Sequence, residues 1–280
     1  MATLTHITMQ RVIVRMLFDP AFARSVIERP EESLKGLGLD ARHVSFLTGP
    51  DPRVWRLDPH RRARSLEALL DEYPASAALL VGSTSQTSAL DAFFSSSHFH
   101  QCIQQRQRLA LAFGSYLIDL AIHLKRADLE GVTTLEKAVA AFRRPSQLPD
   151  NPDAKLHLSP NVALVSVPTG TLEAYVNITQ TLAEKQLSGA AAVILSSFRL
   201  RPFQTTEQRV WVLLEKMNEG SGPGLSVLAD GLASLLVLAN QGTSFESFSE
   251  VARNHGADPG EEREILDSLI DDGLIIEHPR

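Results

Sequence analysis

The chain has 280 residues, of which 44% are hydrophobic and 21% charged, and its formal net charge is −6. This composition is typical of a folded protein of one or two domains and excludes disorder as the main state. The acidic balance gives no reason to expect attraction to nucleic acid or to an anionic membrane. The single cysteine excludes an internal disulfide and a cysteine-rich zinc site.

The segment of residues 1–145 predicts an all-helical domain. Asp19-Pro20 and Asp58-Pro59 each place a capping oxygen ahead of a proline. A proline is tolerated in the first turn of a helix because its missing N–H would be unpaired there anyway. Further along, residues 98–129 carry a wide apolar stripe, which predicts two helices that meet near Gly114.

The domain boundary is predicted at residues 144–153, which contain three prolines and few apolar side chains. It separates a domain of residues 1–145 from one of residues 146–280. After it, residues 161–178 are β-branched on both sides of Pro168-Thr169-Gly170, which predicts a β-hairpin. Residues 191–203 supply further strand candidates.

The segment of residues 205–220, TTEQRVWVLLEKMNEG, suits either a helix or a buried strand, because its apolar residues satisfy both patterns. Residues 225–238 predict a helix. Thr243 and Glu246 form a capping-box pair that opens another helix, which is expected to run to about His255.

A last helix is predicted from Asp258-Pro259 to Gly273, and Leu274-Ile275-Ile276 predicts a strand that returns to the sheet. The expected fold class is therefore α+β. An all-helical N-terminal domain is followed by a small antiparallel sheet and a winged-helix-like C-terminal domain with three helices.

No catalytic residue and no metal site is predicted in this chain. The sequence lacks the GxGxxG, GxxxxGK[ST], GxSxG and HExxH motifs of dinucleotide, triphosphate, acyl and zinc chemistry. His98 and His100 lie two residues apart, on different faces of a helix, and are expected to be one surface and one partly packed side chain. Cys102 is expected to be a small core residue.

A run of arginines stands out in residues 51–64, DPRVWRLDPHRRAR, which also contain one tryptophan. Arginine forks bind carboxylates and stack on aromatic rings, so this run predicts a docking patch for a partner protein. A solvated helix start is the alternative interpretation. The residues predicted to contact the partner are Arg53, Trp55, Arg56, Arg61 and Arg62.

Two further patterns argue against nucleic acid and membrane as partners. Residues 238–280 carry ten acidic side chains against three arginines, which would repel phosphates. Arg11 and Arg15 interrupt the apolar N-terminal residues, and no segment approaches the roughly 18 apolar residues of a membrane span. We expect a protein that is neither exported nor membrane-embedded, and a reducing cytoplasm fits its cysteine content best.

Four stretches resemble one family: residues 18–47 (FDPAFARSVIERPEESLKGLGLDARHVSFL), 51–79 (DPRVWRLDPHRRARSLEALLDEYPASAAL), 93–117 (FFSSSHFHQCIQQRQRLALAFGSYL) and 236–275 (LVLANQGTSFESFSEVARNHGADPGEEREILDSLIDDGLI). The family comprises the partner subunits of multinuclear-iron TIM-barrel oxygenases in ribosomal-peptide modification, of the methanobactin and 3-thiaglutamate type. Its wider family has been labelled DNA-binding. The resemblance covers both ends of the chain and is weak between Ser146 and Phe203.

The resemblance implies a division of labour. The iron and its oxygen chemistry would belong to the TIM-barrel subunit, and this chain, without a cofactor of its own, would support that subunit and bind the leader of the precursor peptide. The modified residue would be a cysteine. The thiaglutamate type, in which a C-terminal cysteine loses its β-carbon, is favoured over the methanobactin type, in which cysteine becomes an oxazolone with a thioamide. A stand-alone winged-helix regulator or adaptor is the alternative function.

Family members bind the peptide as an added strand beside a winged-helix-like sheet, so the resemblance favours a strand for RVWVLL. Strand addition needs an exposed edge for main-chain hydrogen bonds and apolar pockets for alternate side chains. Val210, Val212 and Leu214 are predicted to pair with the leader, and Ile265, Leu269 and Ile270 of the last helix to wall the groove. The alternative is that all six are core residues.

Overall fold

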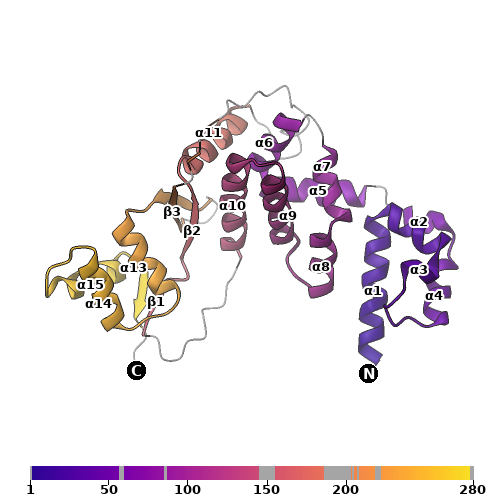
Figure 1. The fold of residues 1–280 in the computed structure, drawn as a ribbon, viewed down its shortest axis with the longest axis horizontal. Coiled ribbons are helices and arrows are strands. Elements are labelled where there is room, and N and C mark those ends of the chain that lie inside the picture. Colours follow the sequence, from indigo (N-terminus) through magenta and orange to yellow (C-terminus); the bar gives the residue numbers. More distant parts are fainter. Residues whose placement is uncertain are drawn as a thin grey trace. The chain divides into compact units, whose positions relative to one another are not determined.

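The structure is a computed structural model that describes residues 2–56, 60–84, 87–144, 155–185, 203, 205–206, 208–217 and 222–277 (Figure 1). The fold is α+β, as the sequence predicts, with helices through the first half and strands in the second. Of the described residues, those within Met1–Leu120 and Leu182–Arg199 form a first compact unit, and those within Ala121–Thr181 and Leu200–Arg280 form a second. The predicted boundary lies, from residue 145 on, outside the described residues.

The first unit is built from helices. They are α1 (Ala2–Phe18), α2 (Pro20–Glu28), α3 (Pro30–Ser33), α4 (Ala41–Thr48), η1 (Pro52–Arg56), α5 (Arg61–Glu72), α6 (Pro74–Thr84), α7 (Ser88–Asp91), η2 (Ala92–Ser95), α8 (Ser97–Gln105) and most of α9 (Leu109–His123). Asp19 caps α2 as predicted, because its carboxylate accepts the N–H groups of Ala21 and Phe22. Asp58-Pro59 lies outside the described residues.

Two apolar clusters hold the first unit together. One packs the buried face of α1 against α2 and α4, and its members include Met9, Val12, Met16, Val26 and Leu47. The other is aromatic: the rings of Phe18, Phe93, Phe94, Phe99 and Phe113 lie with neighbouring centroids 5.1–5.6 Å apart. Tilted and edge-on pairs of this kind add to the burial of their area.

The break between the two long helices lies earlier than predicted. The sequence placed it near Gly114, but Gly114 is inside α9, and α8 ends at Gln105. Arg106 takes a left-handed conformation with φ of 54°, and the N–H of Gln107 then bonds to the Cys102 carbonyl. The prediction was wrong because glycine was used as the signal, whereas here an arginine accepts the strained φ at the helix end.

The second unit contains α10 (Ala127–Phe142), β1 (Leu156–Leu158), β2 (Val162–Pro168), most of α11 (Thr171–Glu184), β3 (Arg209–Glu215), β4 (Gly224–Val227), α13 (Asp230–Asn240), α14 (Phe245–Asn254), α15 (Glu261–Asp271) and β5 (Ile275–Glu277). Its larger sheet is antiparallel with the strand order β2-β3-β4. The segment RVWVLL, which suited helix or strand, is therefore the central strand.

Both faces of this sheet are covered, which explains the continuous apolar run of β3. On one face, Val167 and Val212 pack in a cluster with Leu135 of α10, and Figure 1 shows α10 alongside β2. On the other face, Leu213 and the half-buried Trp211 pack against the core of the C-terminal helices. Successive residues of β3 thus enter two different cores.

The C-terminal helices form the winged-helix-like part. α13, α14 and α15 enclose a core that includes Leu236, Phe248 and Leu266. A second, smaller sheet closes it: β1 pairs with β5, and Leu156 of β1 also forms a bridge with Thr243 between α13 and α14. The predicted return of the last strand to a sheet is confirmed, although its partner is β1.

Two predicted elements differ from the structure. The β-hairpin around Pro168-Thr169-Gly170 is wrong, since β2 ends at Pro168 and α11 begins at Thr171 after a turn in which Gly170 has φ of 89°. The helix predicted over residues 225–238 begins only at Asp230, because β4 occupies its first turn. β-branched residues favoured strand in the first case, and the long apolar run hid the strand in the second. The strand candidates at 191–202 lie outside the described residues.

Gly131 of α10 allows this helix to approach the turn before α11 closely. A Cβ at this position would collide with Oγ1 of Thr171 and lie 3.2 Å from Pro168 Cδ. We expect Gly131→Ala to destabilise the protein by about 1–3 kcal/mol in urea unfolding, because the overlap outweighs the better helix propensity of alanine.

Gly222→Ala is the matched control, since no atom lies within 4 Å of its added Cβ. We expect this variant to unfold within about 0.5 kcal/mol of wild type. A Gly131→Ala protein as stable as wild type would contradict the close approach of α10 to Thr171.

Candidate functional site

The predicted peptide-binding strand lies in the middle of the sheet. β2 pairs with β3 over its whole length, and β4 pairs with Val212–Glu215. The side chains of Val212 and Leu214 are fully buried and that of Val210 is half-buried. An added strand cannot pair with β3 over residues 212–215, so the predicted site has to be corrected to an outer edge of the sheet.

β4 supplies one outer edge, and the hydrogen-bonding register shows which of its groups face outward. The N–H of Leu228 donates to the Trp211 carbonyl at 2.9 Å, so the alternate residues Gly224 and Ser226 also direct their backbone groups to β3. The N–H and C=O groups of Leu225 and Val227 therefore point away from the sheet. The Val227 side chain is 53% exposed.

β2 forms the opposite edge, and it is largely blocked. Pro168 has no N–H to offer, and the N–H of Val162 donates to the Ser159 carbonyl. Arg209 reaches over from β3 and donates to the carbonyl and the hydroxyl of Ser166, at 2.6 and 3.1 Å. Proline and a charged side chain are common protections of an edge strand, which leaves β4 as the more open edge.

The three residues predicted on α15 belong to the core. Leu269 is buried, and Ile265 and Ile270 pack as half-buried side chains against the same cluster. α15 contacts α14 and β5, whereas α13 is the helix that packs on β3. The structure therefore does not set the predicted wall of α15 beside the predicted strand.

The arginine run of residues 51–64 divides into different environments. Arg53 is 92% exposed at its side chain, with only a 3.9 Å ion pair to Asp51. Arg61 is half-buried and already has an interaction within the protein. The side chain of Arg56 lies outside what the structure describes. Arg53 is thus the arginine of this run that is best placed to meet a partner.

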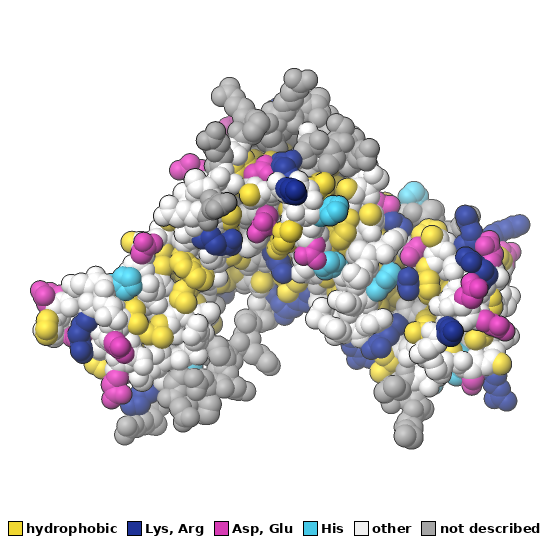
Figure 2. All heavy atoms as spheres, in the orientation of Figure 1, with side chains coloured by type: hydrophobic (Ala, Val, Ile, Leu, Met, Phe, Trp, Pro, Cys, Tyr) yellow, Lys and Arg dark blue, Asp and Glu magenta, His cyan; other side chains and the backbone are white. Residues whose placement is uncertain are grey.

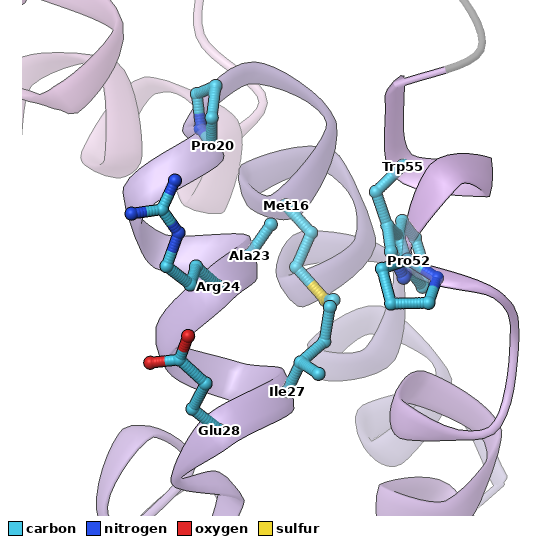
Figure 3. Close-up of a pocket in the computed structure, with 8 residues that line it drawn as sticks. All are labelled: Met16, Pro20, Ala23, Arg24, Ile27, Glu28, Pro52 and Trp55. Carbon is cyan, nitrogen blue, oxygen red and sulfur yellow. The ribbon is translucent and has the colours of Figure 1, made fainter.

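Trp55 lies in the wall of a hollow of about 160 Å³ in the first unit (Figure 3). Met16 and Ile27 lie in the middle of the view, with Pro52 and Trp55 opposite α2. The indole N–H of Trp55 is buried and has no acceptor in the described part of the chain. An apolar hollow beside an exposed arginine has the composition of an interface anchor site.

Arg62 has an internal role. Its guanidinium holds the Asp91 carboxylate through two bonds of 2.6 and 2.7 Å, and it also donates to the carbonyls of Asp91 and Phe18. Its Cζ lies 5.3 Å from the ring centroid of Phe94. Arg62 thus ties α5 to α7 and to the end of α1, and its prediction as a partner contact is replaced by this structural contact.

The residues considered for metal or nucleophilic chemistry are dispersed. Across the described ranges, no group of three or more His, Cys, Asp or Glu side chains could hold a metal ion. His98 pairs with Asp119 at 3.0 Å. Cys102 is buried, as predicted, and burial raises the pKa of its thiol. The thiol therefore lacks the thiolate character of a nucleophile.

Comparisons with known proteins add no assignment. No protein-family model matches the chain, and a search of curated proteins gave no significant match. Among the described residues, no helix combines the length and the apolar character needed to cross a membrane.

The internal contact of Arg62 predicts a stability effect. We expect Arg62→Ala to lower the free energy of unfolding by about 2 kcal/mol, because it removes several hydrogen bonds and leaves Asp91 without its cation. Thermal and urea unfolding measure this change. Arg53→Ala is the control and should lie within about 0.5 kcal/mol of wild type, since exposed ion pairs contribute little. Equal stability of the two variants would remove the clamp role of Arg62.

Proposed function

We propose that this chain is the non-metal partner subunit of a heterodimeric non-haem iron oxygenase that modifies a cysteine in a ribosomally made precursor peptide. The iron belongs to the TIM-barrel subunit, and this chain binds the precursor and supports that subunit in the cytoplasm. The favoured modification is excision of the β-carbon from a C-terminal cysteine. This assignment rests on the family resemblance of both chain ends, and the open edge of β4 supports its peptide-binding part.

The peptide would bind as an extra strand beside β4. Leu225 and Val227 offer two N–H donors and two C=O acceptors on this edge, enough for a short extended segment. Apolar side chains flank it: Val227 is 53% exposed, and Met217 is 55% exposed with its sulfur beside Gly224. Methionine adapts its shape to different apolar partners, so these side chains suit the alternate residues of an extended peptide.

The alternative is a winged-helix regulator, which the three C-terminal helices and the small sheet support. A regulator of this kind would read DNA with its recognition helix. The first turn of α15 carries Glu261, Glu262 and Glu264, and negative charge at that end disfavours contact with phosphates. An adaptor role without DNA remains compatible with the same helices.

Proline at Val227 tests the strand-addition site. The substitution removes an outward N–H, whereas the bonds of β4 to β3 come from alternate residues and stay intact. We expect Val227→Pro to weaken binding of the fluorescently labelled precursor peptide about ten-fold in anisotropy, with an unfolding temperature near that of wild type. The peptide is the one encoded beside the gene of the iron subunit.

Val227→Ala is the matched control, because it keeps the N–H while it shortens the same side chain. We expect its affinity to stay within about three-fold of wild type. A folded Val227→Pro protein that binds normally would place the peptide elsewhere. Absence of both an iron-subunit gene and a short cysteine-ending reading frame nearby would favour the regulator or adaptor.

Arg53 tests the contact with the iron subunit. We expect Arg53→Glu to lower the affinity of the two subunits about three- to ten-fold in a pull-down titration, and to reduce the salt dependence of their association. Arg42→Glu, also at an exposed arginine of the first unit, is the control and should leave the affinity unchanged. Equal effects of the two changes would indicate general charge attraction and remove Arg53 from the interface.

A further inference from the structure

A second cavity in the first unit, of about 240 Å³, lies between α1, the start of α2, the turn after α3 and α8. Two arginines one turn apart on α1, Arg11 and Arg15, line it together with His100 of α8. In Figure 2, basic side chains gather over α1. The remaining wall is mainly apolar and includes Phe22, Leu37 and Ile103.

The polar atoms of this cavity are buried without partners. Nε of Arg11, Nε of Arg15 and Nε2 of His100 are all inaccessible to solvent and have no hydrogen-bond partner. Buried polar groups are nearly always paired, because an unpaired one costs about 1–3 kcal/mol. Three unpaired nitrogens around one cavity therefore indicate a missing ligand that accepts hydrogen bonds.

The two guanidinium groups are held in place for such a ligand. Arg11 donates from Nη2 to the Gln104 carbonyl at 2.6 Å, which fixes one end of its fork. The Arg15 guanidinium stacks on Phe22, with Cζ 3.8 Å from the ring centroid. Each fork is thus oriented by one contact and keeps its Nε–H unpaired, which is the arrangement of a preformed site.

The charges around the cavity select a monoanion. Burial lowers the pKa of Arg15 and Asp19 raises it, but arginine stays protonated at neutral pH. Burial and the charge of Arg15 lower the pKa of His100, with Asp19 opposing them, so this imidazole is neutral at pH 7. Two arginine charges face one aspartate charge. The surplus of one positive charge suits a carboxylate better than a phosphate dianion.

We infer that this cavity is a binding site for a small organic carboxylate with a short apolar group. The carboxylate oxygens would accept the unpaired N–H groups of Arg11 and Arg15, and the apolar group would contact Phe22, Leu37 and Ile103. The volume lies below the roughly 300–1,000 Å³ of drug-sized sites, which limits the ligand to a few carbons beyond the carboxylate. A free acid or the terminal carboxylate of a peptide could supply this chemistry.

Calorimetric titration of the full chain tests the site with defined probes. Isovalerate stands for a free acid, and N-acetyl-leucine stands for the last residue of a peptide. We expect a Kd of about 1 mM or below for the better of the two, which also identifies the source of the carboxylate. Isovaleramide and N-acetyl-leucinamide, which lack the charge, should bind at least ten-fold more weakly. Inorganic phosphate should bind more weakly than either acid.

Substitutions locate the binding within the cavity. We expect Arg15→Gln to weaken carboxylate binding at least ten-fold while its unfolding temperature stays at or above that of wild type, since the change removes an unpaired buried cation. Arg24→Gln, at an exposed position on α2, is the control and should bind normally. Retained binding by Arg15→Gln, equal binding of acid and amide, or no binding of either acid at 10 mM would overturn the inference. Tighter binding of phosphate would overturn the assignment to a carboxylate.

A pH titration separates the site from general charge attraction. A bound carboxylate favours the protonated form of His100 and so raises the pKa that burial and Arg15 lower in the free protein. Binding therefore takes up a proton, and we expect affinity to rise as pH falls from 7.5 to 5.5, where the ligand is still ionised. His100→Gln should bind with little pH dependence in this range. A pH dependence unchanged in that variant would exclude His100 from the site.

Discussion

Burial of β3 on both of its faces is the constraint on which the second unit depends. Its alternate residues enter two separate cores, one shared with α10 and one shared with the C-terminal helices. The strand must therefore be straight, apolar and paired on both sides over residues 212–215. Because its own edges are used in this way, any strand exchange with another molecule is left to the neighbouring strands, and their different protection makes β4 the open one.

The fold was largely predictable where local signals were strong. Asp19 ahead of Pro20 gave a helix start that the structure confirms, and the α+β class followed from the order of the segments. The binding edge was not predictable. Periodicity indicates whether a residue is buried, but the order of strands in a sheet depends on pairing between distant segments, so β3 could not be recognised as central. The same limit applies to Arg62, whose partner Asp91 lies 29 residues away.

The proposed contacts with other molecules lie in different units. Arg53 and the hollow beside Trp55 belong to the first, whereas the edge of β4 belongs to the second. A chain that brings a peptide to a separate iron protein needs one surface for each of them. The cavity around Arg11 and Arg15 is a third feature, and no motif pointed to it, because two arginines four residues apart are common on helices and acquire meaning only when α8 covers them.

The pairing of β1 with β5 has a consequence for how the chain folds. Leu156 faces Glu277 across the small sheet, so the winged-helix-like part is not a continuous stretch of sequence. Its core is closed only when the two ends of the second unit meet, and such non-local pairing slows folding, whereas the helices of the first unit form mainly local contacts. The first unit should therefore reach its native structure well before the second. A fragment that starts after β1 would leave the backbone of Thr243 and of β5 without its partner strand.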